Sequence, residues 1–255
     1  MPHHIVTIPC LSDNYAFLVH DADTGATALI DAPDAPPILA ELKKRGWQLS
    51  HVLLTHHHWD HVEGLADILA EHSAKVFGAV ADEHRLPALD HALSEGDTFD
   101  FGGEAVAVLD VSGHTVGHIA FHFPDTKAVF TGDSLMAMGC GRLFEGTPAQ
   151  MFHSLEKLAA LPDDTTVCSG HEYTTSNCTF ATSLGENNAA VDQRVAETAG
   201  LRAKDIATVP SLLGLEKQTN PFLRSADPAL QAAIGLAGAD PVDVFTEVRK
   251  RKDNF

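Results

Sequence analysis

The sequence is poor in cysteine and in positive charge. Its 17 Lys and Arg residues face 35 Asp and Glu residues, so the formal net charge is −18. A net anion repels phosphates, which argues against a nucleic-acid partner. The four cysteines form no CxxC pair and match no zinc-knuckle spacing. We expect reduced, mostly buried thiols of a cytosolic protein at Cys10, Cys140, Cys168 and Cys178.

Long hydrophobic runs are also missing. The first ten residues, MPHHIVTIPC, have no basic region followed by a long apolar stretch, so they do not resemble a secretory signal. No apolar stretch approaches the roughly 20 residues that a membrane span requires. The sequence therefore predicts a cytoplasmic protein without a membrane partner, and nothing in it predicts a protein partner.

What is present is a pattern of alternating strands and helices. The 255 residues, of which 44% are hydrophobic, allow one large domain or two smaller ones. Apolar runs predict strands at 5–8, 15–19, 27–30, 51–54, 75–77, 105–111, 119–123, 128–131 and 165–168. Helical spacing appears between them at 37–45, 62–71 and 148–160.

The character of the chain changes after about Tyr173. From there it is rich in Ala, Leu and Glu, with helical spacing near 189–199, 228–236 and 241–252, and we expect no strand. The simplest interpretation is a βαβ-type domain over residues 1–173, followed by an all-helical domain over residues 174–255.

The stretch THHHWDHVEG, from Thr55 to Gly64, concentrates metal-ligating side chains directly after an expected strand. On an extended backbone, residues two apart face the same side, so His56 and His58 can converge while His57 points away. Asp60 and His61 come at the opening of the expected helix 62–71. Histidine nitrogen and aspartate oxygen are typical ligands of zinc and similar divalent ions.

Three further candidates follow expected strands in loops of small residues: His114 in SGHTVGH, Asp133 in FTGDS and His171 in CSGHEYT. Functional sites of α/β sheets are usually built at such strand ends. Seven ligands are too many for one tetrahedral ion, but they suit two ions that share a carboxylate. We expect an ordinary surface or core role for the isolated histidines His3, His4, His20, His72, His84, His91 and His153.

These four motifs, in this order and spacing, resemble the metallo-β-lactamase superfamily. The resemblance implies an α+β fold, a four-layer αβ/βα sandwich with two metal ions at one edge, and here a C-terminal all-helical domain. It implies that Asp31 lies near the site, outside the ligands, and that His118 orients a ligand or packs nearby. By matching position, the ligands of one metal would be His56, His58 and His114, those of the other Asp60, His61 and His171, and Asp133 would bridge them.

A longer resemblance covers nearly the whole chain. MGCGRLFEGT, GHEYT, NPFLR and VRKRKDNF are similar to the glyoxalase II family of hydroxyacylglutathione hydrolases. That family implies hydrolysis of the thioester of S-D-lactoylglutathione to glutathione and D-lactate by a metal-bridging hydroxide, the second step of methylglyoxal detoxification. It implies two divalent metal ions, zinc first with iron or manganese as alternatives, and it makes Asp60 and Asp133 the catalytic carboxylates. No convincing serine or cysteine nucleophile competes, because Cys168 and Ser169 have no paired base of their own.

The family's glutathione contacts fall on Arg142, Phe144, Tyr173, Arg249 and Lys252. Arg249 and Lys252 are three apart in an expected helix and share a face. The alternative for this basic cluster is a cationic helix end that complements the helix dipole. Some family members carry tyrosine where this chain has Phe144, which cannot donate a hydrogen bond.

Three other functions are compatible with parts of the sequence. The persulfide dioxygenases share the fold and use a single iron, but NPFLR and the basic terminal helix argue against them. The tRNA-processing ribonucleases of the superfamily need an electropositive surface, which a charge of −18 does not provide. A non-enzymatic metal-binding protein would favour a closed site with cysteine ligands.

Overall fold

The computed structural model describes residues 3–255, which form two compact units. The first unit comprises the described residues up to Asp110 together with Val116–Gly132, and the second comprises Val111–Thr115 together with Asp133–Phe255. This division by packing differs from the expected boundary at residue 173.

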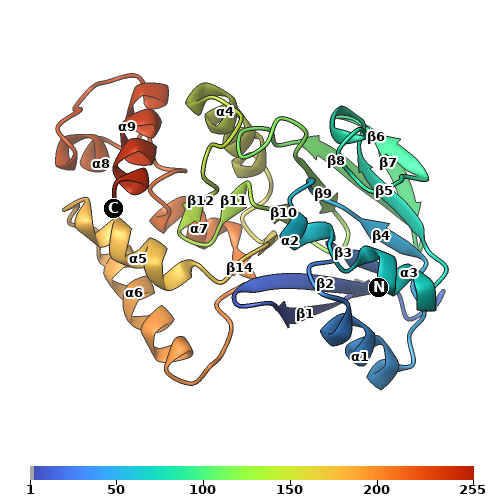
Figure 1. The fold of residues 1–255 in the computed structure, drawn as a ribbon. Coiled ribbons are helices and arrows are strands. Elements are labelled where there is room, and N and C mark those ends of the chain that lie inside the picture. The colour runs from blue at the N-terminus through green and yellow to red at the C-terminus, as the bar shows by residue number, and fades with distance from the viewer. Residues whose placement is uncertain (1–2) are drawn as a thin grey trace. The chain divides into compact units, whose positions relative to one another are not determined.

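A sheet of six strands forms one part of the first unit, and the strands follow one another in chain order (Figure 1). The first three pair antiparallel and the later ones pair parallel. Parallel pairing requires crossover connections, and helix α1 (Ala35–Arg45) supplies the one before the fourth strand. The strands are β1 (His4–Cys10), β2 (Asn14–His20), β3 (Thr27–Ile30), β4 (His51–Leu53), β5 (Lys75–Ala79) and β6 (His91–Leu93).

Helices α1 and α3 (Leu65–Glu71) cover one face of this sheet. Ile38 of α1 and Ile68 of α3 are fully buried in one cluster with Leu29 of β3. Four further strands of the same unit form an antiparallel meander with a phenylalanine-rich interior. These strands are β7 (Thr98–Phe101), β8 (Glu104–Asp110), β9 (Ile119–Phe123) and β10 (Ala128–Gly132).

The expected helix 62–71 is wrong in its extent, because the chain forms two helices there. Helix α2 (Trp59–Val62) ends before Gly64, and α3 begins after it. The backbone N–H of Gly64 donates to the carbonyl of Ala32 at 2.9 Å, and a Cβ on Gly64 would lie only 2.7 Å from the backbone nitrogen of Ala35. This close approach bends the chain, so Asp60 and His61 lie inside a separate short helix.

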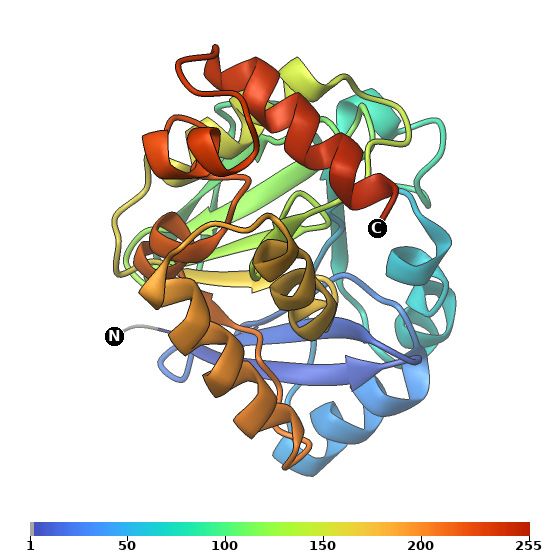
Figure 2. The ribbon, with the colours of Figure 1, turned by 90° about the vertical axis from the view of Figure 1, so that its left-hand side faces the viewer.

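The second unit contains most of the helices. Thr147 and Gln150 form a capping box at the start of α4, with proline at its first position. Helices α5 and α6 lie side by side (Figure 2). The helices are α4 (Pro148–Ala159), α5 (Thr174–Ser183), α6 (Ala189–Arg202), α7 (Leu213–Thr219), α8 (Pro228–Ala233) and α9 (Pro241–Asp253).

The expectation of no strand after Tyr173 is wrong. The short strand β14 (Ser211–Leu212) pairs antiparallel with β13 (Thr166–Ser169). Two residues are too few to show the alternation that identifies a strand. The unit also contains a hairpin of β11 (Leu135–Met136) and β12 (Gly139–Cys140).

A buried polar network ties this hairpin to the NPFLR motif. The amide of Asn220 donates to the carbonyls of Met136 at 3.0 Å and Gly139 at 2.9 Å. Glu216, which is fully buried, accepts from the backbone N–H of Met138 and pairs with Arg194 at 3.2 Å. The network satisfies polar groups that would otherwise destabilise the core, and it fixes the backbone of the hairpin from Met136 to Gly139.

The sequence also predicted the state of the cysteines and the absence of a membrane span. All four cysteines are free and buried. Among the described residues, no helix is both long enough and apolar enough to cross a membrane.

Candidate active site

The loop after β4 turns two histidines toward each other. His56 Nε2 lies 3.1 Å from His58 Nδ1. Two nitrogens bound to one tetrahedral zinc at 2.0–2.1 Å would lie about 3.3 Å apart. His57 points elsewhere, with its Nδ1 2.8 Å from the carboxylate of Asp82. The alternation expected from the sequence is therefore confirmed.

Neighbouring side chains hold the outer nitrogens of two ligand candidates in this unit, His56 and His61. Asp31 accepts from Nδ1 of His61 at 2.8 Å, and it also accepts from the hydroxyl and the backbone N–H of Thr55. The Thr55 hydroxyl in turn lies 3.0 Å from His56 Nδ1. Fixing Nδ1 in this way leaves Nε2 as the ligating atom of both rings and sets their orientation.

Two more side chains complete the surroundings in the first unit. Asn14, at the start of β2, donates its amide to Asp60, reaching the carbonyl at 3.0 Å and the carboxylate at 3.1 Å. The ring of His118 stacks on that of His56 at 4.6 Å, as expected for a residue that packs beside a ligand. The sequence did not reveal Asn14, because a single asparagine shows no ligand spacing.

In the second unit a single carboxylate oxygen faces two histidines. Asp133 Oδ2 lies 3.5 Å from His114 Nε2 and 3.2 Å from His171 Nε2, and all three residues are buried. His114 Nδ1 donates to the carbonyl of Arg142 at 2.7 Å, which again turns Nε2 inward. Gly141 permits this packing, because a Cβ there would overlap the backbone of Asp133.

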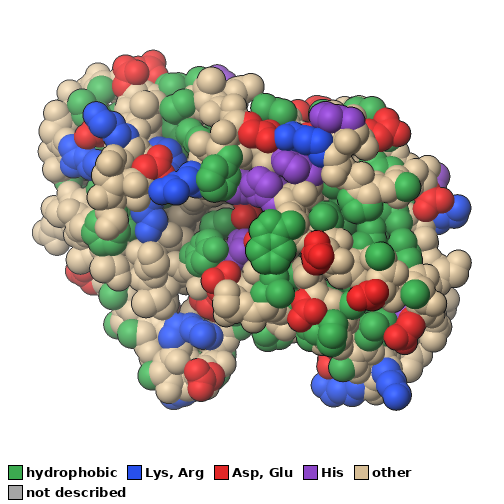
Figure 3. Space-filling view, in the orientation of Figure 1, with side chains coloured by type: hydrophobic (Ala, Val, Ile, Leu, Met, Phe, Trp, Pro, Cys, Tyr) green, Lys and Arg blue, Asp and Glu red, His purple; other side chains and the backbone are tan. Residues whose placement is uncertain are grey.

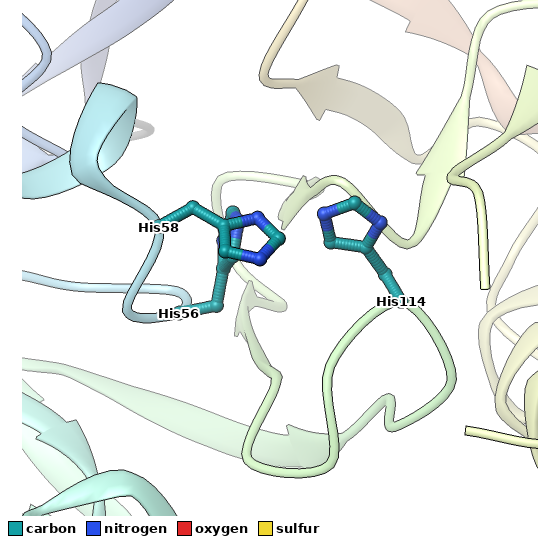
Figure 4. A group of neighbouring side chains, drawn as sticks. All are labelled: His56, His58 and His114. Carbon is teal, nitrogen blue, oxygen red and sulfur yellow. The ribbon is translucent and has the colours of Figure 1, made fainter. Parts of the chain in front are cut away.

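The donor set suits divalent metal ions. It consists of imidazole nitrogens and carboxylate oxygens, which zinc, iron and manganese all accept. Figure 4 draws three of these candidates, His56, His58 and His114, and shows the rings of His56 and His58 close to each other. Each of the seven candidates offers one such ligand atom, and they are His56, His58, Asp60, His61, His114, Asp133 and His171.

Two basic residues of α9 form more contacts within the protein than the sequence predicts. Lys and Arg side chains gather over this helix (Figure 3). Arg249 is only 5% exposed, and its guanidinium donates to Asp253 at 2.7 and 3.0 Å and to the carbonyl of Cys140 at 3.0 Å. Lys252 lies 3.2 Å from the hydroxyl of Ser176, and burial, with Arg249 as a second cause, lowers the pKa of its ammonium.

The remaining expected substrate contacts are more open. Arg142 has a side chain that is 57% exposed, with Nε 3.6 Å from Asp253. Phe144 is 61% exposed and packs edge-on against the ring of His114 at 5.3 Å. Tyr173 is 40% exposed and stacks on His171 at 4.6 Å. Both aromatic rings therefore lie against ligand candidates while keeping an accessible surface.

Most of the site residues that the sequence did not reveal form hydrogen bonds to the predicted site residues or to the backbone near them. Thr55 contacts the ring of its neighbour His56, whereas Asp82 and Asn220 reach His57 and the backbone of Gly139 from distant segments. Asp253 is different, because its spacing of four from Arg249 on a helix is a readable ion-pair signal.

Comparison with known proteins identifies the family. Residues 12–171 match the model of the metallo-beta-lactamase superfamily, and residues 172–255 match that of the hydroxyacylglutathione hydrolase C-terminus. The chain belongs to the hydroxyacylglutathione hydrolase family of the metallo-β-lactamase superfamily. The expected family is therefore confirmed, and so is the fold, a metallo-β-lactamase fold with a C-terminal helical domain.

Full-length relatives carry the name of this family, and a solved structure shares the fold. The chain is 67% identical to a hydroxyacylglutathione hydrolase of Ruegeria pomeroyi over all of both chains. It is 60% identical to one of Jannaschia sp. (strain CCS1) over 98% of each. The crystal structure of TTHA1623 in a di-iron-bound form matches with a TM-score of 0.63 and 28% identity, covering 86% of this chain and 100% of that one.

Proposed function

We propose that this member of the hydroxyacylglutathione hydrolase family hydrolyses the thioester of S-D-lactoylglutathione and related 2-hydroxyacyl-glutathiones. The products are glutathione and the 2-hydroxy acid, D-lactate for the first substrate, as in the second step of methylglyoxal detoxification. The full-length match to relatives named for this activity supports the substrate. The observation that carries the chemistry is the single Asp133 oxygen facing both His114 and His171.

The residues present fit a pair of divalent metal ions. We assign His56, His58 and His114 to one ion, Asp60, His61 and His171 to the other, and Asp133 to both. When bound, such ions lower the pKa of a water toward neutrality and polarise a carbonyl. Zinc is the first candidate, with iron or manganese as alternatives.

The overall reaction needs no protein nucleophile. A water oxygen adds to the thioester carbon, the carbon–sulfur bond breaks, and glutathione leaves as a thiolate that then takes a proton. A thiol with a pKa of about 8.5 leaves without a strong protein acid. Burial raises the pKa of Cys140 to about 11, and it also raises the pKa of Cys168, so neither thiol is suited to attack at neutral pH.

The roles of the protein side chains follow from their contacts. Asp60 and Asp133 act as the catalytic carboxylates, and Asn14 holds Asp60 in place. Phe144 and Tyr173 offer exposed rings for packing on glutathione, beside His114 and His171.

The glutathione carboxylates require local cations in an acidic protein. Arg142 and Lys252 supply accessible positive charge. Arg249 contributes by anchoring the end of α9 to Cys140 as well as by its charge. In this proposal residues 1–173 are the catalytic domain, residues 174–255 complete the glutathione site, and the protein acts in the cytoplasm without a nucleic-acid partner.

The test is the release of free thiol from S-D-lactoylglutathione by the full-length, metal-loaded protein. We expect catalytic release that stops when the metal is removed by a chelator and returns when it is restored. Absence of thiol release by protein shown to contain metal would refute the proposed function. Oxygen uptake with glutathione persulfide, without thioester hydrolysis, would replace it with an oxygenase.

A further inference from the structure

His57 is the one member of the HHH run that the metal assignment does not use, yet it is firmly held. Its Nδ1 lies 2.8 Å from Asp82 Oδ2, and only 17% of its side chain is exposed. Asp82 is completely buried at the end of the short 3₁₀-helix η1 (Val80–Asp82). A buried carboxylate is costly unless it is paired, so this contact is a specific one.

The Asp82 carboxylate is itself fixed from two other directions. Arg85 donates to Asp82 Oδ1, the oxygen that His57 does not contact, through Nε at 3.0 Å and also through Nη2. Gly117 packs so closely that a Cβ there would lie 2.1 Å from Asp82 Cγ. A carboxylate paired with arginine accepts hydrogen bonds, so Nδ1 of His57 is the donor. Asp82 therefore cannot move without displacing Arg85 or the backbone at Gly117.

The bond from His57 lies at the middle of the ligand loop. One end of this loop is held at Thr55, which Asp31 binds through two hydrogen bonds, and the other end is His58, which precedes α2. Between these ends there is no helix or strand to set the backbone. Because neighbouring side chains alternate in direction, drawing His57 toward Asp82 turns His56 and His58 to the opposite side, where their nitrogens meet at 3.1 Å.

We propose that His57 is a positioning residue for the metal ligands, and that the Asp82–Arg85 pair acts through it to hold His56 and His58 in register before metal binds. This inference deepens the proposed function and rests on it for its catalytic meaning. It concerns the shape of the ligand loop, so it is measurable through metal retention, independently of thioester hydrolysis.

The test compares two substitutions of similar size in the full-length protein. His57→Asn places an amide N–H near the position of Nδ1 and can still donate to Asp82, whereas His57→Leu cannot. Metal per chain is measured by elemental analysis after dialysis against graded chelator, together with the melting temperature of the metal-free protein. Loss of a partner that orients a ligand typically weakens metal affinity about 10–100-fold. We expect His57→Leu to lose its metal at a chelator concentration at least about tenfold lower than the parent requires. For His57→Asn, we expect this chelator concentration to stay within about threefold of the value for the parent.

His72→Leu is the matched control. His72 is 8% exposed, and its Nδ1 lies 3.0 Å from Gln48 Oε1, but it lies outside the ligand loop. This variant should retain metal like the parent even where its melting temperature falls. Equal metal loss in His72→Leu and His57→Leu at equal loss of stability would show a merely structural role and overturn the proposal.

A second substitution covers the case in which His57→Leu does not fold. His57→Gln keeps a polar side chain but carries its amide one bond further out, so it should retain metal less well than His57→Asn. Parent-like retention in either His57→Gln or folded His57→Leu would overturn the proposal. If the variants separate as expected while the parent releases no thiol, the positioning role stands and the proposed hydrolysis fails.

Discussion

The ligand loop of the first unit and helix α9 of the second unit use charged and polar side chains in opposite ways. In the loop, neighbours hold the outer nitrogen of His56, and the inner nitrogen turns toward His58. In α9, the guanidinium of Arg249 donates hydrogen bonds to the carboxylate of Asp253 and to the carbonyl of Cys140. The candidate metal ligands are thus oriented by their neighbours with one nitrogen left to face a metal ion. Part of the cationic cluster is instead used to hold the protein's own structure together.

The largest effect on activity is expected from substitution of Asp133, one of the candidate metal ligands. Asp133→Asn keeps the size of the side chain but removes the negative charge that faces His114 and His171. We expect the rate of thioester hydrolysis to fall by about 10²–10³-fold or more, the scale of losing a main electrostatic stabiliser. Steady-state kinetics together with metal analysis checks this, and a fall of less than tenfold with full metal content would contradict a shared role for the carboxylate.

A smaller effect is expected at Asp31. Asp31→Asn presents an amide N–H to His61 Nδ1 in place of an acceptor, which favours the tautomer with its proton on the ligating nitrogen. Metal affinity should fall about 10–100-fold. Chelator competition measures this, and unchanged affinity would show that Asp31 serves folding alone.

Substitution of Arg249 tests the structural role that the comparison gives to the basic residues of α9. Arg249→Met leaves the Cys140 carbonyl and part of the Asp253 carboxylate without a donor. The free energy of unfolding should fall by about 1–3 kcal/mol. Denaturant unfolding of the metal-free protein provides the measurement. A raised KM with unchanged stability would instead assign Arg249 to substrate alone.

Lys252 is expected to give the smallest effect. Lys252→Gln removes a partly exposed charge, so KM should rise about twofold to fivefold with kcat unchanged. Burial lowers the pKa of this ammonium, so it loses its charge below the ordinary lysine value as pH rises. The KM of the parent should therefore rise in alkaline solution before pH reaches about 10.4, and that of Lys252→Gln should not. Parallel KM profiles for the two proteins would exclude this role.

The sequence predicted most of the fold because strands with strong apolar runs reveal themselves locally. Each of the nine expected strands overlaps an observed one. The omissions have physical causes: β14 is too short to alternate, and α5 begins with Thr and Ser residues that favour turns over helix interiors. The break at Gly64 depends on the distant backbone of Ala32 and Ala35, which no local pattern encodes.

The candidate site divides in the same way. The ligand candidates have short, readable spacing, so the shared side of His56 and His58 and the opposite direction of His57 could be anticipated from alternation alone. Their partners Asn14 and Asp82 could not, because each reaches the motif from tens of residues away. The burial of Arg249 could not be anticipated either, since a basic run at a helix end is equally typical of a solvated face.

The central claim is that two metal ions, sharing Asp133, are needed for thioester hydrolysis. Its most direct test is to add zinc stepwise to the metal-free protein and to follow thiol release from S-D-lactoylglutathione against bound metal per chain. The account predicts that the rate reaches its maximum only when two ions are bound per chain. A maximum at one ion per chain, or no thiol release at two, would contradict it.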